Sequence, residues 1–269
     1  MIIGVGNTRG AINYFIMITT KTQQEIKTLR EGGKLLSRIL KQLAQAAKPG
    51  VSGDMLDKMA YDLITQAGAK PAFLNYQANF MDIPFTHSLC VSKNEVIVHG
   101  VPTKDLILAV GDLVSLDLGL IYKNLFVDSA ISIGIGKISD KKKKLLTVTK
   151  RALLEGIKAA IAGHTLGDVG YAIQSCAEKN GLVVIKNLVG HGVGYELHES
   201  PEVFNFGRPH KGIVLNKGNV LALEPMLTYE SGEIIENPDG SFSTLNGEPA
   251  CHFEHSIAVM PQKSLILTL

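Results

Sequence analysis

Several features that define other protein classes are missing from this sequence. It has no tryptophan and only three cysteines, Cys90, Cys176 and Cys251, which form no Cys-x-x-Cys pair. This spacing argues against a disulfide framework and a thiolate zinc site, and it favours a reducing compartment. No apolar run reaches the roughly 18 residues that a membrane-spanning helix needs, and the apolar stretch 14–18 is too short for a secretory signal. We therefore expect a cytoplasmic protein with no membrane partner.

The chain also lacks an excess of either charge. Its 27 Lys and Arg residues nearly balance 25 Asp and Glu residues, which gives a net charge of +2 and no electrostatic case for binding DNA. There is neither a Gly-x-x-x-x-Gly-Lys-Ser/Thr loop nor a Gly-x-Ser-x-Gly elbow, which argues against a P-loop NTPase and a serine hydrolase. With 269 residues, 45% of them hydrophobic, the chain can bury one sizeable core.

The spacing of apolar residues predicts two pairs of helices. The first pair covers about 22–48 and 54–66, and the second covers 145–162 and 168–179. A stretch rich in β-forming residues follows each pair. The order therefore indicates an α+β chain in which helices cover one side of a sheet.

The glycines that end these helices repeat at a fixed distance. Each glycine of the first half has a counterpart 113 residues later, the pairs being Gly50 with Gly163 and Gly68 with Gly181. This repeat predicts an internally duplicated domain over residues 17–269, with a seam between its halves where a site is expected. Residues 1–16 show no periodicity, and we expect a disordered N-terminal extension there.

Two carboxylates interrupt a predicted β-hairpin. The stretch LVSLDLGLIYKNLFVDSAISIGI alternates apolar with small or polar residues on either side of Lys123-Asn124, which we take as a two-residue turn. With that turn, Asp128 lies opposite Gly119, which shares a strand face with Asp117. Two like charges in an apolar setting need compensation, for which a divalent cation is the usual means. The alternative is that one aspartate caps a turn and the other faces solvent, and the hairpin alone leaves both readings open.

Further candidate ligands lie in apolar stretches. Glu224 sits in VLALEPM and Glu254 in CHFEHSI, although glutamate is rarely buried without a partner. His191 lies in GHGVG, where glycines permit a close approach of the backbone and a neutral imidazole suits a divalent ion. A lone histidine in such a turn is more often structural, but beside four carboxylates it becomes a candidate ligand.

This set of four carboxylates and one imidazole is rich in oxygen. It exceeds what one tetrahedral zinc takes and suits two adjacent divalent ions that share bridging carboxylates. Such a pair activates water for nucleophilic attack near neutral pH, so the predicted reaction class is metal-assisted hydrolysis.

Six strings in this sequence resemble the type I methionine aminopeptidases of peptidase family M24, of the shorter, bacterial type. The resemblance runs from about Lys21 to Leu269, and the strings occur in the family's order and spacing. They are NEVIVHGVP from Asn94, the LD and VD pairs ending at Asp117 and Asp128, GHGVG from Gly190, LHESP from Leu197, LEPM from Leu223 and FEHS from Phe253.

The resemblance implies a pita-bread fold, in which pseudo-twofold halves have a central antiparallel sheet with helices outside. It implies that Asp117 chelates one metal ion, that Asp128 and Glu254 bridge two ions, and that His191 and Glu224 complete the second site. Two divalent ions per chain are expected, and Co, Mn, Fe and Zn are all compatible with these ligands.

The resemblance also implies catalytic roles. Glu224 is expected to act as general base, His198 to stabilise the tetrahedral intermediate, and His99 to bind the scissile peptide near its nitrogen. The five remaining histidines, including His252, are expected to have no catalytic task. The pocket for the methionine side chain is expected to be lined by Tyr76, Phe85, Cys90, Leu197 and Phe242. This wall departs from the family's, because Leu197 stands where an aromatic residue is usual and no tryptophan is present.

The implied activity is removal of the initiator methionine from nascent polypeptides by a monomer. A related aminopeptidase or an Xaa-Pro-type peptidase of the same fold is the alternative, although those relatives carry a long N-terminal domain. Loss of any ligand would indicate a non-catalytic binding module instead, but all five are present. The lysines at 141–144 stand just before a predicted helix, where positive charge is unfavourable, which suggests a transient ribosome contact.

Overall fold

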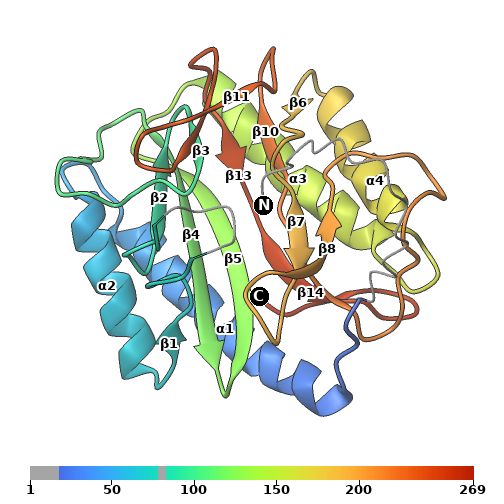
Figure 1. The fold of residues 1–269 in the computed structure, drawn as a ribbon. Helices are drawn as coiled ribbons and strands as arrows, with labels where there is room; N and C mark the ends of the chain where they lie inside the picture. The colour runs from blue at the N-terminus through green and yellow to red at the C-terminus, as the bar shows by residue number, and fades with distance from the viewer. Residues whose placement is uncertain (1–17, 78–82) are drawn as a thin grey trace.

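The computed structural model describes residues 18–77 and 83–269 of the chain, so the expected extension over 1–16 lies outside the described residues. Helices lie outside a set of antiparallel strands (Figure 1). The helices are α1 Gln23–Ala46, α2 Gly53–Gln66, α3 Asp140–Ala159 and α4 Leu166–Glu178. The strands of the first half are β1 Lys70–Pro71, β2 Cys90–Lys93, β3 Val96–Val98, β4 Leu113–Tyr122 and β5 Leu125–Gly134. Those of the second half are β6 Val183–Val184, β7 Gly190–Gly192, β8 Glu199–Val203, β9 Val220–Leu223, β10 Met226–Thr228, β11 Ile234–Glu236, β12 Phe242–Thr244, β13 Cys251–His252, β14 His255–Ala258 and β15 Leu265–Ile266.

The duplicated helix pairs are present, and their ends match in backbone conformation. Gly50 and Gly163 have φ angles of 88° and 90°, and Gly68 and Gly181 have φ angles of 73° and 66°. Each glycine lies in the left-handed region that glycine adopts without steric cost, just after a helix has ended. The repeat seen in the sequence is therefore a repeat of helix terminations.

Helix α3 begins earlier than the sequence predicted. The prediction placed its start at Leu145, but the helix starts at Asp140, because the Ser139 hydroxyl caps it by accepting the N–H of Lys142. The lysine run 141–144 therefore lies inside the first turns of the helix and not before it. Asp140 in the first turn offsets part of the unfavourable positive charge.

Among the described residues, the strands form four antiparallel sheets. One consists of β1, β2, β4 and β5 from the first half, and the largest has the order β15-β14-β9-β7-β8. Helix α1 packs on β4 and β5, while α3 packs on β5, β9, β10 and β13. The apolar side chains accordingly divide into a large cluster under α1 and α2 and a second one under α3 and α4.

The two halves meet where β5 runs beside the β13–β14 connection. The Glu254 N–H donates to the Ala130 carbonyl over 2.9 Å, and the Ser256 hydroxyl donates to the Asp128 carbonyl over 2.7 Å. Carbonyl groups of β5 thus accept hydrogen bonds from residues near β14 in the second half. Hydrogen bonds therefore join the two halves at the seam expected from the duplication.

None of the helices in the described part of the chain is long and apolar enough to cross a membrane.

Candidate metal centre and active site

The β4–β5 hairpin sets the separation of its two aspartates. Lys123 and Asn124 have φ angles of 50° and 65°, so they form the left-handed two-residue turn that matches the twist of a hairpin. The register then pairs Gly119 with Asp128, as the sequence predicted. Asp117 lies two residues from Gly119 on the same strand, so both carboxylates leave the same face of the hairpin.

His191 lies on β7 between two glycines that allow other backbone segments to come close. A Cβ at Gly190 would meet the Ala222 carbonyl oxygen at 2.3 Å, and a Cβ at Gly192 would meet the Ser200 oxygen at 2.5 Å. The Nδ1 of His191 lies 2.9 Å from the Gly192 carbonyl, which can only accept a hydrogen bond. In the neutral ring the proton is therefore on Nδ1, and Nε2 has a free lone pair for a metal ion.

Glu254 lies between β13 and β14 at the seam. Its N–H donates to Ala130, and its carbonyl accepts the Ser129 hydroxyl over 2.7 Å, so its backbone is bound to β5 on both sides. Asp128 is fixed by the same strands, because its N–H donates to the Ser256 hydroxyl over 3.0 Å. The seam therefore brings the carboxylate of Asp128, from the first half, next to that of Glu254, from the second half.

Glu224 directly follows β9 and faces two histidines. Its Oε1 lies 3.4 Å from the Nε2 of His191, and its Oε2 lies 3.5 Å from the Nε2 of His252. Its carbonyl accepts the Asn205 side-chain amide over 3.1 Å, which holds the end of β9 in place. At 12% exposure the carboxylate is largely enclosed.

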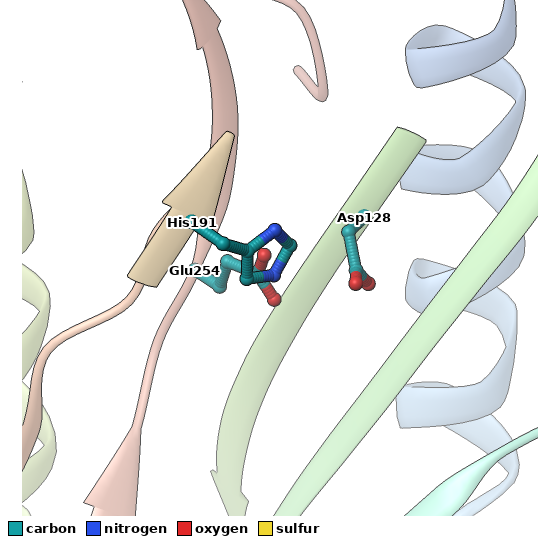
Figure 2. Close-up of side chains that lie close together, drawn as sticks. All are labelled: Asp128, His191 and Glu254. Carbon is teal, nitrogen blue, oxygen red and sulfur yellow. The ribbon is translucent and has the colours of Figure 1, made fainter. Parts of the chain in front are cut away.

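The side chains of Asp128, His191 and Glu254 point toward one another (Figure 2). One ligand atom from each lies within 4.8 Å of the others, close enough for a single ion to contact all three. Asp117 and Glu224 line the same pocket, whose volume is about 710 Å³ including the part open to solvent. All five residues predicted as ligands are therefore brought together at the seam.

The charge state of this cluster fits a site for a divalent cation. Burial is the main cause of raised pKa values in this cluster, and repulsion from nearby carboxylates adds to it. The pKa values of Asp117 and Glu254 lie well above their usual range, and that of Asp128 is raised to about 8. Among the described residues, Asp117 Oδ1 and Glu254 Oε1 are buried and have no hydrogen-bond partner. Buried carboxylates without partners are costly unless a cation compensates them, so these donors match a divalent ion.

Glu224 differs from the other acids of the cluster. Burial opposes its ionisation, but the contact with His252 and the electrostatic interaction with His191 outweigh burial, so its pKa is lowered. A carboxylate that stays ionised near neutral pH can accept a proton, which suits a general base.

The two non-ligand histidines both line the pocket. His99 follows β3 with a φ of 58°, and its ring packs edge-on against Phe242 at 5.8 Å between centroids. His198 lies 4.4 Å from His191 between ring centroids, and the Tyr76 hydroxyl lies 2.6 Å from its Nδ1. Burial lowers the pKa of His99 to about 4 and that of His198 well below its ordinary value, so both rings are neutral hydrogen-bonding groups.

The apolar wall of the pocket contains most of the residues that were expected to line the pocket for a methionine side chain. Tyr76, Phe85, Cys90 and Leu197 line it, whereas Phe242 lies behind His99 and is not part of the lining. Sequence reasoning missed other lining residues, namely Phe73, Val98, Leu188 and Met226. Each is adjacent to or near a predicted site residue along the chain, but nothing in the local pattern separates it from an ordinary core residue.

His252 was assigned no catalytic task from sequence, but the structure places it against Glu224. It is 1% exposed, and among the described residues neither ring nitrogen has a hydrogen-bond partner within normal range. His252 precedes Glu254 by two positions, but residues 253 and 254 lie between β13 and β14, so strand periodicity could not have identified it.

Comparisons with known proteins agree with this geometry. Residues 27–261 match the model of metallopeptidase family M24. The methionine aminopeptidase of Clostridium acetobutylicum is 39% identical over 254 residues, which cover 94% of this chain and 99% of that protein. The structure of methionine aminopeptidase from Thermotoga maritima has a TM-score of 0.90 at 36% identity, covering 94% of this chain and 99% of that one. Prolidase from Pyrococcus horikoshii shares the fold at a TM-score of 0.74 and 22% identity, over 93% of this chain and 63% of that one.

Proposed function

The chain belongs to metallopeptidase family M24, and we propose that it removes the initiator methionine from new polypeptides by hydrolysing their first peptide bond. It has the family's pita-bread fold, with duplicated halves and a pocket at their seam. The observation that carries the proposal is the convergence of five predicted ligands on one pocket whose remaining wall is apolar. This arrangement supplies a hydrolytic centre beside a subsite for an apolar side chain.

The site holds divalent metal, and we assign two ions to it. Asp117 would bind one ion, His191 and Glu224 the other, and Asp128 and Glu254 would bridge them. The number of oxygen donors supports two ions, because one tetrahedral ion leaves donors unused. When bound, the ions supply Lewis acidity that lowers the pKa of water and polarises a carbonyl group.

The protein's own residues supply the proton transfers and the orientation of the peptide. Glu224 accepts the proton of the attacking water at its carboxylate, which its lowered pKa keeps ionised. His198 donates a hydrogen bond to the carbonyl oxygen as negative charge develops on it. His99, which also lines the pocket, binds the peptide near the scissile nitrogen.

The substrate class follows from the pocket. Tyr76, Phe85, Cys90 and Leu197 present an apolar surface that fits an unbranched, polarisable side chain such as methionine. The substrates are nascent chains with a free N-terminal methionine, so we place the activity in the cytoplasm and expect a monomer to be sufficient. An Xaa-Pro-type specificity is the alternative, because prolidases share this fold.

Release of methionine from a Met-Ala-Ser peptide tests the function. The purified protein should be assayed after chelation and after addition of Mn, Fe, Co or Zn. We expect release that depends on metal, is abolished by Asp117→Ala, and is kept by Asp62→Ala, a change at an exposed aspartate of α2. Cleavage of an Xaa-Pro peptide in place of Met-Ala-Ser would overturn the specificity, and no cleavage by the metal-loaded protein would overturn the enzymatic role.

A further inference from the structure

The hydroxyl of Tyr76 and the Nδ1 of His198 are 2.6 Å apart, although 122 residues separate them in the chain. The distance is that of a short hydrogen bond. The two rings also pack together, with centroids 5.1 Å apart and planes inclined by 60°. A residue of the apolar wall is therefore bonded directly to a histidine of the reaction centre.

The phenol can act as the donor in this pair. Burial raises the pKa of Tyr76, so its hydroxyl keeps a proton at neutral pH. If that proton is donated to Nδ1 of His198, Nδ1 must have its lone pair free. A neutral imidazole has a single N–H, which then lies on Nε2.

The backbone around Tyr76 holds the phenol in place. The Phe85 N–H donates to the Tyr76 carbonyl over 2.8 Å, and the Asn75 N–H donates to the Phe85 carbonyl over 2.7 Å. The Tyr76 N–H in turn donates to the Phe73 carbonyl over 2.9 Å. The position of the hydroxyl is therefore set before any substrate is bound.

We propose that Tyr76 is a positioning residue that fixes the orientation and tautomer of His198, so that its Nε2–H faces the carbonyl oxygen of the scissile peptide. This inference rests on the role given to His198 in the proposed function. It gives Tyr76 a task beyond contact with the methionine side chain. Without its hydroxyl, the ring of His198 can rotate, and the tautomer with the proton on Nδ1 becomes populated.

Nitrogen NMR tests the tautomer without depending on activity. The protein should be labelled with 15N-histidine and loaded with diamagnetic Zn, and the His198 signals identified by their loss in His198→Asn. We expect long-range proton–nitrogen correlations with the pattern of an Nε2–H ring in the parent protein, and a shift toward the mixed pattern in Tyr76→Phe. Tyr195→Phe is the matched control, because it removes a phenol that lies three residues from His198 and bonds to Glu25. A parent ring protonated on Nδ1, or signals that Tyr76→Phe does not move, would overturn the inference.

Kinetics provide the second measurement. Tyr76→Phe keeps the aromatic wall, so KM for Met-Ala-Ser should stay within about threefold while kcat falls about tenfold or more. The metal content and the melting temperature should match the parent's. An unchanged kcat, or a loss confined to KM, would overturn the inference. If the parent protein itself released no methionine, the proposed function would fail, whereas the NMR measurement would still decide whether Tyr76 sets the tautomer.

Discussion

Lys21 and Glu199 form an ion pair that is shut off from solvent. Their Nζ and Oε2 atoms are 2.6 Å apart, and the side chains are 0% and 6% exposed. Glu199 also accepts the hydroxyl of Thr19 and the N–H of Glu196. One carboxylate therefore ties the segment before α1 to the turn that carries His198.

Replacing Lys21 should destabilise the fold strongly. In Lys21→Met, Glu199 is left as a buried charge without a cation, and we expect a loss of about 3–5 kcal/mol in the free energy of unfolding. Urea denaturation measures this loss, and Glu199→Gln in the same chain should restore part of it. Lys58→Met removes an exposed partner of Asp62 and should cost less than about 1 kcal/mol. Equal losses for the two lysines would contradict this account of the pair.

The number of bound ions should change in a defined way when single ligands are removed. Isothermal titration after chelation, with elemental analysis of the reloaded protein, should give two ions per chain. Asp117→Asn should retain one ion, because His191 and Glu224 still hold the second. Asp128→Asn should weaken binding of both, since this carboxylate bridges them. Saturation at one ion per chain in the parent protein would rule out the dinuclear assignment.

The metal-free protein should lose stability as the pH rises. The pKa of Asp128 is about 8 in the fold against an ordinary value of 3.8, so the folded state holds a proton that the unfolded state releases. Stability is therefore lost progressively between these two values and is lowest above pH 8. With chelator present, Asp128→Asn should be more stable than the parent at pH 8, by a few kcal/mol at most, and the two should converge near pH 4. Bound metal should remove the parent's loss of stability with rising pH, because the ion compensates the ionised carboxylate. A metal-free parent protein whose stability increases with rising pH would contradict the prediction.

The lysines at the start of α3 should divide into structural and exposed members. Lys142 donates to the Asn94 side chain and to the Gly111 carbonyl, both over 2.7 Å, so Lys142→Met should cost about 1–3 kcal/mol. Lys143 and Lys144 are exposed, and replacing both by alanine should change stability by no more than about 0.5 kcal/mol.

The exposed pair is therefore the proper test of a ribosome contact. If Lys143→Ala with Lys144→Ala leaves co-sedimentation with ribosomes unchanged, the proposed contact does not involve these lysines. If Lys142 were also replaced, weaker co-sedimentation could come from a less stable fold as well as from a lost ribosome contact.

Local features of the fold could be predicted from the sequence because their causes are local. A two-residue turn at Lys123-Asn124 fixes the hairpin register, so the pairing of Asp128 with Gly119 follows from alternation alone. The helix ends follow from glycine at left-handed positions. The start of α3 was misjudged because lysines just after Ser139 have no apolar periodicity, although Ser139 itself is a typical N-cap.

The convergence of the candidate ligands could not be worked out from local patterns. It depends on hydrogen bonds between β5 and the strands around Glu254, which residue spacing does not encode. Their apolar surroundings made these residues candidates, the family resemblance assigned their individual roles, and the structure brings them together. The contacts of His252 with Glu224 and of Tyr76 with His198 form only in the packed pocket, and residue spacing does not predict them.

The seam also determines when this protein can begin to work during its own synthesis. A ribosome delivers the chain from its N-terminus, so the hairpin with Asp117 and Asp128 leaves the exit tunnel long before Glu254 does. Until the later strands emerge, β5 is paired only with β4, and the pocket lacks the residues of the second half. Each new copy therefore cannot form the complete pocket until the segment that carries Glu254 has emerged and docked on β5.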